Sequence, residues 1–358
     1  MLRSFTIRNF RGFSEVLLPS LTRVNLVTGK NNVGKTTVLE ALFLYAGCRN
    51  PDLPGRIEAL RGRTHFLLHP EGVWGWLFPG KRTDKTVEFV GTHDLGWTDR
   101  LRVTLKVSTT AVTSADEQES PDFSSGDAAS STGRGPKDLI LEHERSDGSV
   151  ETSRAFIERN QLKVEMGEPA SDYPGLYLPP GTTIGRQDAE RYSTIDSVGK
   201  MNEVVELIGQ LDGRVRRLSL AQEGPGPVLK GDIGLPELVP VYALGQGLCR
   251  FLSMVLAVGA SGKGIVLVDE IENGLHYSAM ADVWRGISHM SRKWDVQVVA
   301  TTHSWECIRA AFEAFRDEHA EDLSVYRLDR VKGDVRAVRY DAEALATSVE
   351  GDLDVRGW

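Results

Sequence analysis

The sequence predicts an α/β fold around a mixed central sheet, and three stretches carry this prediction. The apolar run Val24–Val27 is followed directly by the glycine-rich loop Gly29–Thr37, and an amphipathic stretch comes after that loop. Ile265–Val268 and Val296–Ser304 are two further apolar runs that end in polar side chains, with a helix-length segment between them. Short runs rich in β-branched residues are typical of strands buried on both faces, and parallel strands need a connection of this length. We therefore expect parallel strands in the centre and helices on their faces.

The composition is that of an ordinary globular chain. Of its 358 residues, 41% are apolar and 26% are charged, which is enough to bury a core in two domains or in one large lobed unit. The N-terminal MLRSFTIRNF lacks the features of a secretory signal, and no apolar run approaches the length of a membrane span. Cys48, Cys249 and Cys307 are too few and too scattered to form a disulfide framework or a zinc site. We therefore expect a cytoplasmic protein without membrane association.

The net charge of −8 argues against a protein coated in DNA-binding charge, but it leaves room for a local basic groove. Arg214, Arg216 and Arg217 form the tightest basic cluster. We interpret this cluster as a solvated helix end rather than a nucleic-acid contact.

The first 107 residues contain strands, the glycine-rich loop, a helix and further strands. Residues 2–10 alternate loosely between apolar and polar side chains, and residues 14–19 form a paired strand. The Pro- and Gly-rich segment 48–56 ends the helix that follows the loop. Trp74 and Trp76 come next with a spacing of two, and we favour core or interface packing for them over stacking on an adenine or another base.

An antiparallel β pattern begins at residue 86 and predicts a small sheet lobe. Apolar and polar residues alternate through residues 86–107, and three more strands follow between residues 138 and 166. The segment 108–137 is rich in Ser, Thr, Gly and Asp and nearly lacks large apolar residues, so we expect a disordered surface loop. Leu176–Pro180 is expected to end the lobe.

The second half of the chain returns to helices and buried strands. Apolar side chains recur with helical spacing in residues 196–212, which predicts one amphipathic helix. Glycines and prolines in residues 224–240 indicate loops around short strands, and Leu244–Val258 reads as a strongly apolar helix. Residues 282–295 supply the helix between the two buried strands.

The glycine-rich loop GKNNVGKTT matches the phosphate-binding pattern G-x-x-x-x-G-K-[ST] between a strand and a helix. Gly29 and Gly34 let the backbone amides face a phosphate, because a Cβ would obstruct that arrangement. We expect Lys35 to neutralise the β- and γ-phosphates and the Thr36 hydroxyl to bind Mg²⁺. The N-terminus of the following helix adds positive potential.

Two carboxylates, Asp269 and Glu270, follow the buried strand Ile265–Val268. Adjacent carboxylates at the end of such a strand are costly unless a cation or a reacting water uses them. We expect Asp269 to hold Mg²⁺ through its water shell and Glu270 to polarise the attacking water. His303 follows the next buried strand and should lie on the same edge of the sheet, so we favour a catalytic role for it over a structural hydrogen bond.

In combination, these motifs resemble the ABC-type ATPase heads of the RecF, SMC and OLD (overcoming lysogenization defect) group. The sequence is most similar to the standalone prokaryotic AAA/RecF-like ATPases, whose motifs appear here as IRNFRGF, GKNNVGKTT, LGQG, VDEIENGLH and TTHS. The resemblance extends from IRNFRGF to VRYDAEAL and implies a P-loop NTPase fold of the ABC-ATPase head type, with a mixed central sheet flanked by helices and an antiparallel β lobe. Residues 1–107 would then form the N-terminal half of the head and the start of the lobe, 138–180 the rest of the lobe, and 181–358 the C-terminal half.

The resemblance also implies roles for individual residues. Arg11 corresponds to the arginine of the N-F-R motif that approaches the nucleotide, Glu270 to the catalytic glutamate, and His303 to the histidine that senses the γ-phosphate. Asn273–His276 takes the place of the segment that crosses between paired heads. LGQG, Leu244–Gly247, would close over the nucleotide of the opposite subunit, so that two ATP molecules lie between two head-to-tail chains.

These implications define three sets of site residues. The nucleotide-binding set is Arg11, Gly29, Asn31, Asn32, Val33, Gly34, Lys35, Thr36, Thr37, Leu244, Gly245, Gln246 and Gly247. The catalytic set is Glu270, His303 and Lys35, and the Mg²⁺ set is Thr36 and Asp269.

The sequence departs from the family pattern at two places. Ala243 and Gly245 flank the leucine where ABC ATPases carry a signature serine, which favours slower hydrolysis or weaker closure of the dimer. The glutamine that normally links the β lobe to Mg²⁺ has only Gln161 and Gln187 as candidates. The chain also lacks a heptad stretch for the long arms of SMC-type proteins.

A nuclease module is not expected within this sequence. Asp352 and Asp354 spell the D-x-D of such modules, but only four residues follow them, so we interpret them as an acidic tail. The resemblance implies that a nuclease or toxin effector would be a separate partner chain.

Together these observations predict a Mg²⁺-dependent ATPase that forms a homodimer or higher oligomer around ATP and controls that effector. The resemblance implies a role in prokaryotic anti-phage defence or genome maintenance. Two alternatives stay open: a RecF-like repair ATPase that binds DNA directly, and a nucleotide-gated scaffold with negligible hydrolysis. Kinase and GTPase functions are less favoured, because the chain lacks an N-K-x-D guanine motif and its carboxylate pair lies far downstream of Lys35.

Overall fold

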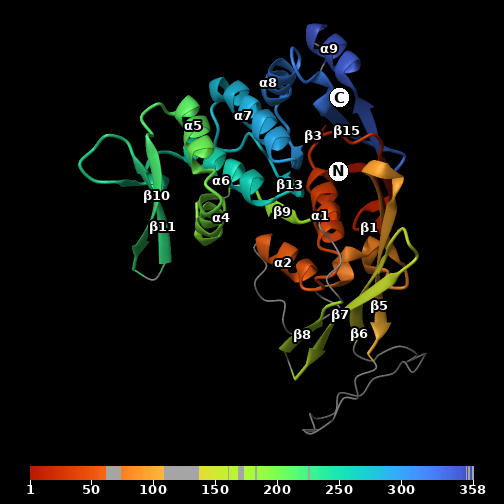
Figure 1. Ribbon diagram of the computed structural model, residues 1–358. Helices are drawn as coiled ribbons and strands as arrows, with labels where there is room; N and C mark the ends of the chain where they lie inside the picture. The colour runs from red at the N-terminus through yellow and green to blue at the C-terminus, as the bar shows by residue number, and fades with distance from the viewer. Residues whose placement is uncertain are drawn as a thin grey trace, which may run out of the picture.

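The computed structural model describes residues 1–61, 74–108, 137–159, 161–167, 173–181, 184–224, 226–351, 353 and 355–356. Two large sheets, with helices between and beside them, make up most of the molecule (Figure 1). The expected loop at 108–137 lies outside the described residues except for its two ends, and so do Asp352 and Asp354.

The central sheet has six strands and mixed topology, which confirms the predicted fold class. Five of its strands are parallel, and one edge strand, β16, runs antiparallel to its neighbour β15. The strands lie in the order β16 (Asp334–Tyr340), β15 (Leu323–Val331), β3 (Val24–Gly29), β14 (Gln297–Thr301), β13 (Ile265–Val268) and β9 (Gly175–Leu178). The three runs from which the fold was predicted are therefore three neighbouring strands.

The second sheet is antiparallel and has seven strands. It joins the N-terminal hairpin to the predicted lobe in the order β2 (Phe13–Leu18), β1 (Leu2–Phe10), β4 (Val87–His93), β5 (Thr98–Val107), β6 (Lys137–Glu144), β7 (Val150–Glu158) and β8 (Gln161–Glu165). The expectation that Leu176–Pro180 ends this lobe was wrong, because β9 pairs in parallel with β13 of the central sheet. A four-residue apolar run fits the edge of either sheet, and only its pairing partner decides between them.

Helix α1 (Lys35–Ala46) lies between the two sheets and shares a core with both (Figure 1). Side chains alternate across the central strands, so Val27 and Leu267 belong to this core, whereas Leu26 and Val266 belong to the core on the opposite face. The opposite face is covered by α4 (Arg186–Ser197), α5 (Met201–Leu211), α6 (Gln246–Ala260), α7 (Met280–Lys293), α8 (Trp305–Phe315) and α9 (Ala342–Glu350). The six-stranded sheet is thus buried on both sides.

Two helix predictions differ from the structure. The single helix expected at 196–212 is two helices, because α4 ends at Ser197 and Gly199 turns the chain with φ 70° before α5 begins. The segment 48–56, predicted as a helix stop, also begins a new helix, α2 (Leu53–Leu60). Pro54 lies in the first turn of α2, where a proline is tolerated because the missing N–H has no helical partner there.

The two tryptophans with a spacing of two lie in different environments. Trp74 is buried in the core, as favoured, whereas Trp76 in the short 3₁₀ helix η1 (Gly75–Leu77) is 45% exposed.

A third sheet lies at the edge of the molecule (Figure 1). It has three strands, β10 (Arg217–Glu223), β11 (Gly226–Asp232) and β12 (Val239–Pro240). The basic cluster that begins at Arg214 therefore leads into a strand and is not a helix end. Among the described residues, no helix is both long and apolar enough to cross a membrane.

Candidate nucleotide site

The predicted phosphate-binding loop lies between β3 and α1, and two of its glycines have backbone angles that other residues avoid. Gly29 has φ 138° and Gly34 has φ 112°. A Cβ on Gly34 would lie 2.5 Å from the Phe13 ring, and one on Gly29 would lie 2.6 Å from the Leu328 carbonyl oxygen. Because α1 begins directly after the loop, at Lys35, its unpaired N-terminal amides lie at the loop. This backbone is a cradle of the kind that binds a phosphate.

The Lys35 side chain bends back over the loop. Its Nζ donates hydrogen bonds to the carbonyl oxygens of Gly29 at 2.8 Å and of Lys30 at 3.2 Å. Burial lowers the pKa of Lys35, and the neighbouring carboxylates, Glu270 foremost, act in the opposite direction. The ammonium group thus lies between the loop and the acidic end of β13.

The carboxylate of Asp269 accepts hydrogen bonds from three hydroxyl groups, which belong to three different elements. Its Oδ2 accepts hydrogen bonds from Thr36 at 2.9 Å and from the Tyr177 hydroxyl at 3.2 Å, and its Oδ1 accepts one from Thr301 at 2.5 Å. The Asp269 residue is only 2% exposed, so these donors replace water around its carboxylate. The structure therefore brings together Thr36 and Asp269, the two residues expected to hold Mg²⁺.

Glu270 is held by its backbone beside Asp269. It has a left-handed φ of 45°, which is uncommon for a residue other than glycine. Its N–H donates a 2.8 Å hydrogen bond to the Thr301 hydroxyl, the same hydroxyl that donates to Asp269. Thr301 was not among the predicted site residues, although it precedes His303 in the predicted TTHS motif. It holds the carboxylate of Asp269 and the backbone of Glu270 at the same time.

These residues face an open cavity of about 890 Å³, a volume within the range of ligand pockets. Its lining consists of Asn31, Asn32, Gly34, Lys35, Thr36, Thr37, Glu40, Ile57, Leu60, Arg61, Tyr177, Pro179, Pro180, Asp269 and Glu270. Most of the predicted phosphate loop is on this list. Val33 is not, because its side chain is buried in the core between the sheets.

One wall of the cavity comes from α2 and from Arg61, which directly follows this helix, and sequence reasoning missed it. Arg61 forms a bidentate pair with Glu40 on α1, with N–O distances of 2.7 and 3.0 Å. Burial raises the pKa of Glu40, while the charges of Arg11 and Arg61 oppose that shift. The one sequence feature that could have placed Glu40 at the site is its position four residues after Thr36, because residues with this spacing lie on one face of a helix.

Arg11, which was expected to approach the nucleotide, lies behind this wall. Its guanidinium pairs with Glu40 at 2.8 Å and with Glu58 at 3.0 Å, and its side chain is 11% exposed. Arg11 does not line the cavity, so in this structure it supports Glu40 rather than the space for a ligand.

His303 lies beyond the end of β14, at the predicted edge of the sheet, but it does not line the cavity. Its side chain is 57% exposed, and Nδ1 lies 3.0 Å from Oε1 of Glu272. The His303 backbone N–H donates to the same carboxylate oxygen at 2.8 Å. Glu272 therefore links the segment after β13 to the segment after β14.

LGQG lies outside the cavity and packs against the segment that follows the carboxylates. Gly245 precedes α6 with φ 120°, and a Cβ on Gly247 would lie 3.2 Å from the Gly274 carbonyl oxygen. Of the described residues that line the cavity, none belongs to LGQG or to Asn273–His276. Tyr242 and Tyr277, which flank these two segments, are 63% and 71% exposed.

Neither candidate glutamine reaches Asp269. Gln161 begins β8 in the antiparallel sheet, and Gln187 on α4 borders a different cavity. Tyr177, from edge strand β9, occupies the position beside Asp269 instead. The only indication of Tyr177 in the sequence was its hydroxyl within the apolar segment LYLPP, and this segment was expected to end the β lobe.

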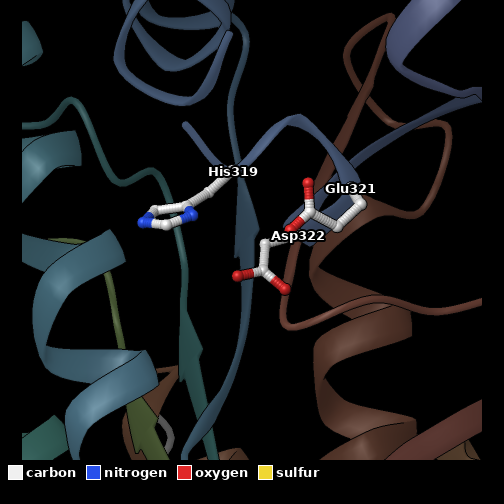
Figure 2. Close-up of side chains that lie close together, drawn as sticks. All are labelled: His319, Glu321 and Asp322. Carbon is white, nitrogen blue, oxygen red and sulfur yellow. The ribbon is translucent and has the colours of Figure 1, made fainter. Parts of the chain in front are cut away.

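A second group of side chains with metal-ligating atoms is His319, Glu321 and Asp322, shown in Figure 2. Arg292 forms an ion pair with Asp322 and lies 3.9 Å from Glu321, and Arg23 lies 3.9 Å from Asp322. Because two arginines balance these carboxylates, we interpret the group as a surface ion-pair cluster.

Comparisons with known proteins agree with the geometry. A protein of Helicobacter pylori (strain ATCC 700392 / 26695) named ATP/GTP phosphatase is 23% identical over 343 residues, which cover 89% of each chain. The DNA replication and repair protein RecF of Idiomarina loihiensis (strain ATCC BAA-735 / DSM 15497 / L2-TR) is 42% identical over 43 residues, 12% of each chain.

SMC heads are among the solved structures to which the chain is similar. An SMC head bound to the C-terminal winged-helix domain of ScpA has a TM-score of 0.49 at 12% identity, covering 97% of this chain and 99% of that one. The SMC head domain from Thermotoga maritima has a TM-score of 0.44 at 11% identity, covering 95% and 99%.

The family comparison covers most of the chain. Residues 24–308 match the family described as "AAA domain, putative AbiEii toxin, Type IV TA system". This range begins at β3, continues through the phosphate loop and both carboxylates, and ends in α8. The chain therefore belongs to this AAA-domain family and is an ATPase with the P-loop α/β fold.

Proposed function

We propose that the chain binds Mg-ATP in the cavity between α1, α2 and β13 and hydrolyses it with Glu270 as general base. The contact between Thr36 and Asp269 carries the proposal, because it joins the phosphate loop to the acidic strand end. The relative named ATP/GTP phosphatase, which aligns along 89% of this chain, supports the same reaction class.

The donors at this point fit a magnesium ion. A hydroxyl and a carboxylate oxygen are the ligand types that Mg²⁺ prefers, and the glycine cradle beside them fits phosphate oxygens. When bound, Mg²⁺ would neutralise charge on the phosphates and on Asp269.

The residues of the chain then have distinct tasks. The loop amides and Lys35 hold the phosphates, with Lys35 exchanging its carbonyl partners for phosphate oxygens. Glu270 accepts a proton from the attacking water, and Thr301 keeps its backbone in position. Tyr177 orients Asp269 through its hydroxyl. His303 adjusts the segment near the γ-phosphate through its contact with Glu272.

A second copy of the chain would complete the site. LGQG and Asn273–His276 lie together outside the cavity, and two exposed tyrosines, Tyr242 and Tyr277, flank them. Large exposed aromatic side chains beside a helix N-terminus suit an interface around an anionic ligand. We therefore propose a head-to-tail dimer with ATP bound between the phosphate loop of one copy and LGQG of the other.

We further propose that this ATP-dependent closure controls a separate effector chain, a nuclease or a toxin, in anti-phage defence or genome maintenance. The family description, which names a putative toxin and a type IV toxin–antitoxin system, supports a link between this chain and such a system. The short match to RecF supports the second candidate, in which DNA is the controlled partner.

Two matched variants test the proposal. Glu270→Gln should bind Mg-ATP but turn it over at least about 100-fold more slowly than the wild type, because general-base catalysis contributes roughly that factor. With excess Mg-ATP it should have the mass of a dimer, whereas Lys35→Ala should stay monomeric. Equal turnover in Glu270→Gln and the wild type would exclude the hydrolytic role, and equal masses of the two variants would exclude the ATP-dependent dimer. Proteins that co-purify with Glu270→Gln but not with Lys35→Ala identify the effector.

A further inference from the structure

Trp76 and Lys81 form an exposed pair in the short helical turns that precede β4. The Nζ of Lys81 lies 4.1 Å from the centre of the Trp76 ring, and Trp76 is 45% exposed. Lys81 has φ 59° and follows Gly80 with φ 56°, so a non-glycine residue adopts a left-handed conformation there. This unusual backbone places the ammonium group over the ring.

Two more cations lie in the same short turn, and none of the three pairs with a carboxylate of the described part of the chain. Lys81, Arg82 and Lys85 are exposed and form no ion pair with a carboxylate among the described residues. By contrast, Arg8 and Arg100 of the antiparallel sheet both contact the carboxylate of Glu88. We call Trp76, Lys81, Arg82 and Lys85 the basic-aromatic surface.

The backbone beneath this surface is fixed rather than loose. The N–H of Arg11 donates a 2.8 Å hydrogen bond to the Leu77 carbonyl, and Trp74 beside it is buried in the core. Lys137 of β6 donates a 3.1 Å hydrogen bond to the Thr83 hydroxyl, which ties the turn to the sheet. A preformed surface loses less entropy when it binds a ligand.

We propose that the basic-aromatic surface binds single-stranded nucleic acid. Unpaired cations in a chain with a net charge of −8 suit a polyanion, because each can replace a condensed counterion on a phosphate. The exposed indole suits an unpaired base, since every base has a face that stacks on an aromatic ring. A duplex offers phosphates but no free base face, and an acidic protein offers neither regular phosphates nor bases. Nucleic acid would thus bind away from the ATP cavity, and this inference does not rest on ATP hydrolysis.

Fluorescence anisotropy with a labelled oligothymidylate of about 20 nucleotides tests this inference on the full chain without nucleotide. Three phosphate contacts predict a slope of about −2 in log K against log salt, so binding should weaken about 20-fold between about 50 and 200 mM salt. Replacing Trp76 by Ala should weaken binding at least about fivefold with the slope unchanged. Arg82→Gln and Lys85→Gln should each reduce the slope by about 0.7.

Lys263→Gln and Lys332→Gln are matched controls, because both lysines are exposed in turns and form no ion pair with a described carboxylate. They should leave affinity and slope unchanged. Thermal unfolding of every variant verifies that the fold is intact, and ATP turnover without oligonucleotide should stay at the wild-type rate in Trp76→Ala. No binding by the wild type at the lowest salt, or equal affinity of Trp76→Ala and the controls, would overturn the proposal. So would duplex binding as tight as single-strand binding.

Discussion

The hydroxyl of Thr36 donates a 2.9 Å hydrogen bond to the carboxylate of Asp269, across a separation of 233 residues in the chain. The contact joins the first turn of α1 to the end of β13, and Thr301 from β14 reaches the other oxygen of the same carboxylate. The carboxyl ends of parallel strands meet at one edge of a sheet, so distant segments supply one site.

Thr301 supports the carboxylate of Asp269 and the backbone of Glu270, so its loss should affect catalysis more than folding. Thr301→Val removes the hydroxyl that donates to Asp269 and accepts from the Glu270 N–H. Loss of such a supporting contact lowers activity by about 10- to 100-fold. Thr302→Val is the control, because the Thr302 hydroxyl accepts from the Ser304 N–H and does not contact either carboxylate. Equal ATP turnover in the two variants would contradict this role.

Tyr177 should matter for Mg²⁺ more than for the fold. Tyr177→Phe removes one hydroxyl donor from Asp269 and keeps the ring. We expect the Mg²⁺ concentration for half-maximal ATP turnover to rise by about 10-fold or more, because the carboxylate loses an orienting partner. Tyr192→Phe is the control. The hydroxyl that it removes donates to the Leu218 carbonyl oxygen, so this concentration should stay unchanged. A shift of the same size in Tyr192→Phe would mean that the Tyr177 effect is not local.

Glu40 should contribute strongly to stability. Glu40 is 1% exposed and pairs with both Arg11 and Arg61. Glu40→Ala therefore leaves the guanidinium of Arg11 buried with only one of its two carboxylate partners. Breaking a buried pair in this way costs about 3 to 5 kcal/mol of unfolding free energy, to be measured by urea denaturation. Glu190→Ala breaks an exposed pair with Arg186 and should cost less than about 1 kcal/mol. Similar losses in both variants would show that the Glu40 network is not buried in solution.

Two histidines in the lobe should give stability a maximum near pH 6.5. Although burial alone opposes its charge, the hydrogen bond to Asp99 raises the pKa of His143 from 6.5 to about 9. Its contribution is therefore complete below pH 6.5 and is lost as pH rises toward 9. Burial lowers the pKa of His93 from 6.5 to about 4, so its contribution is complete above pH 6.5 and is lost as pH falls toward 4.

Each limb of this pH profile has its own variant. His143→Gln should flatten the alkaline limb and His93→Gln the acidic limb of the unfolding free energy, each by up to about 3 kcal/mol. Urea denaturation between pH 4 and 9 measures both limbs. Unchanged slopes in both variants would contradict the assignment.

Much of the site could be predicted because its residues follow strands that are recognisable by composition alone. Val24–Val27 and Ile265–Val268 are apolar and β-branched, so the loop with Lys35 and the carboxylate Asp269 could be placed at strand ends before the structure was known. Thr36 and Asp269 were expected to act together, and the structure places them in hydrogen-bonding contact.

The remainder depended on pairings that a local pattern does not contain. β9 joins the central sheet through its backbone, so the position of Tyr177 follows from strand pairing rather than from its own neighbours. α2 begins in a segment whose Pro and Gly indicate a loop, and only packing against α1 makes Arg61 a wall of the cavity. For Arg11, a local pattern predicted a contact that the structure does not have. Its motif indicated a contact with the nucleotide, but the buried carboxylates of Glu40 and Glu58 hold its guanidinium outside the cavity lining.

The proposed ATP site between two copies is tested most directly by mixing two inactive variants. Lys35→Ala removes the lysine that we propose binds the phosphates but keeps LGQG. Gln246→Glu keeps the loop and places an anion at the exposed N-terminus of α6, where it would repel a phosphate. Each variant alone should have little ATP turnover. An equal mixture should recover about a quarter to a half of the wild-type rate, because each mixed dimer contains one complete site of two and between half and all of the dimers are mixed. A mixture no more active than its two components would contradict an ATP site shared between subunits.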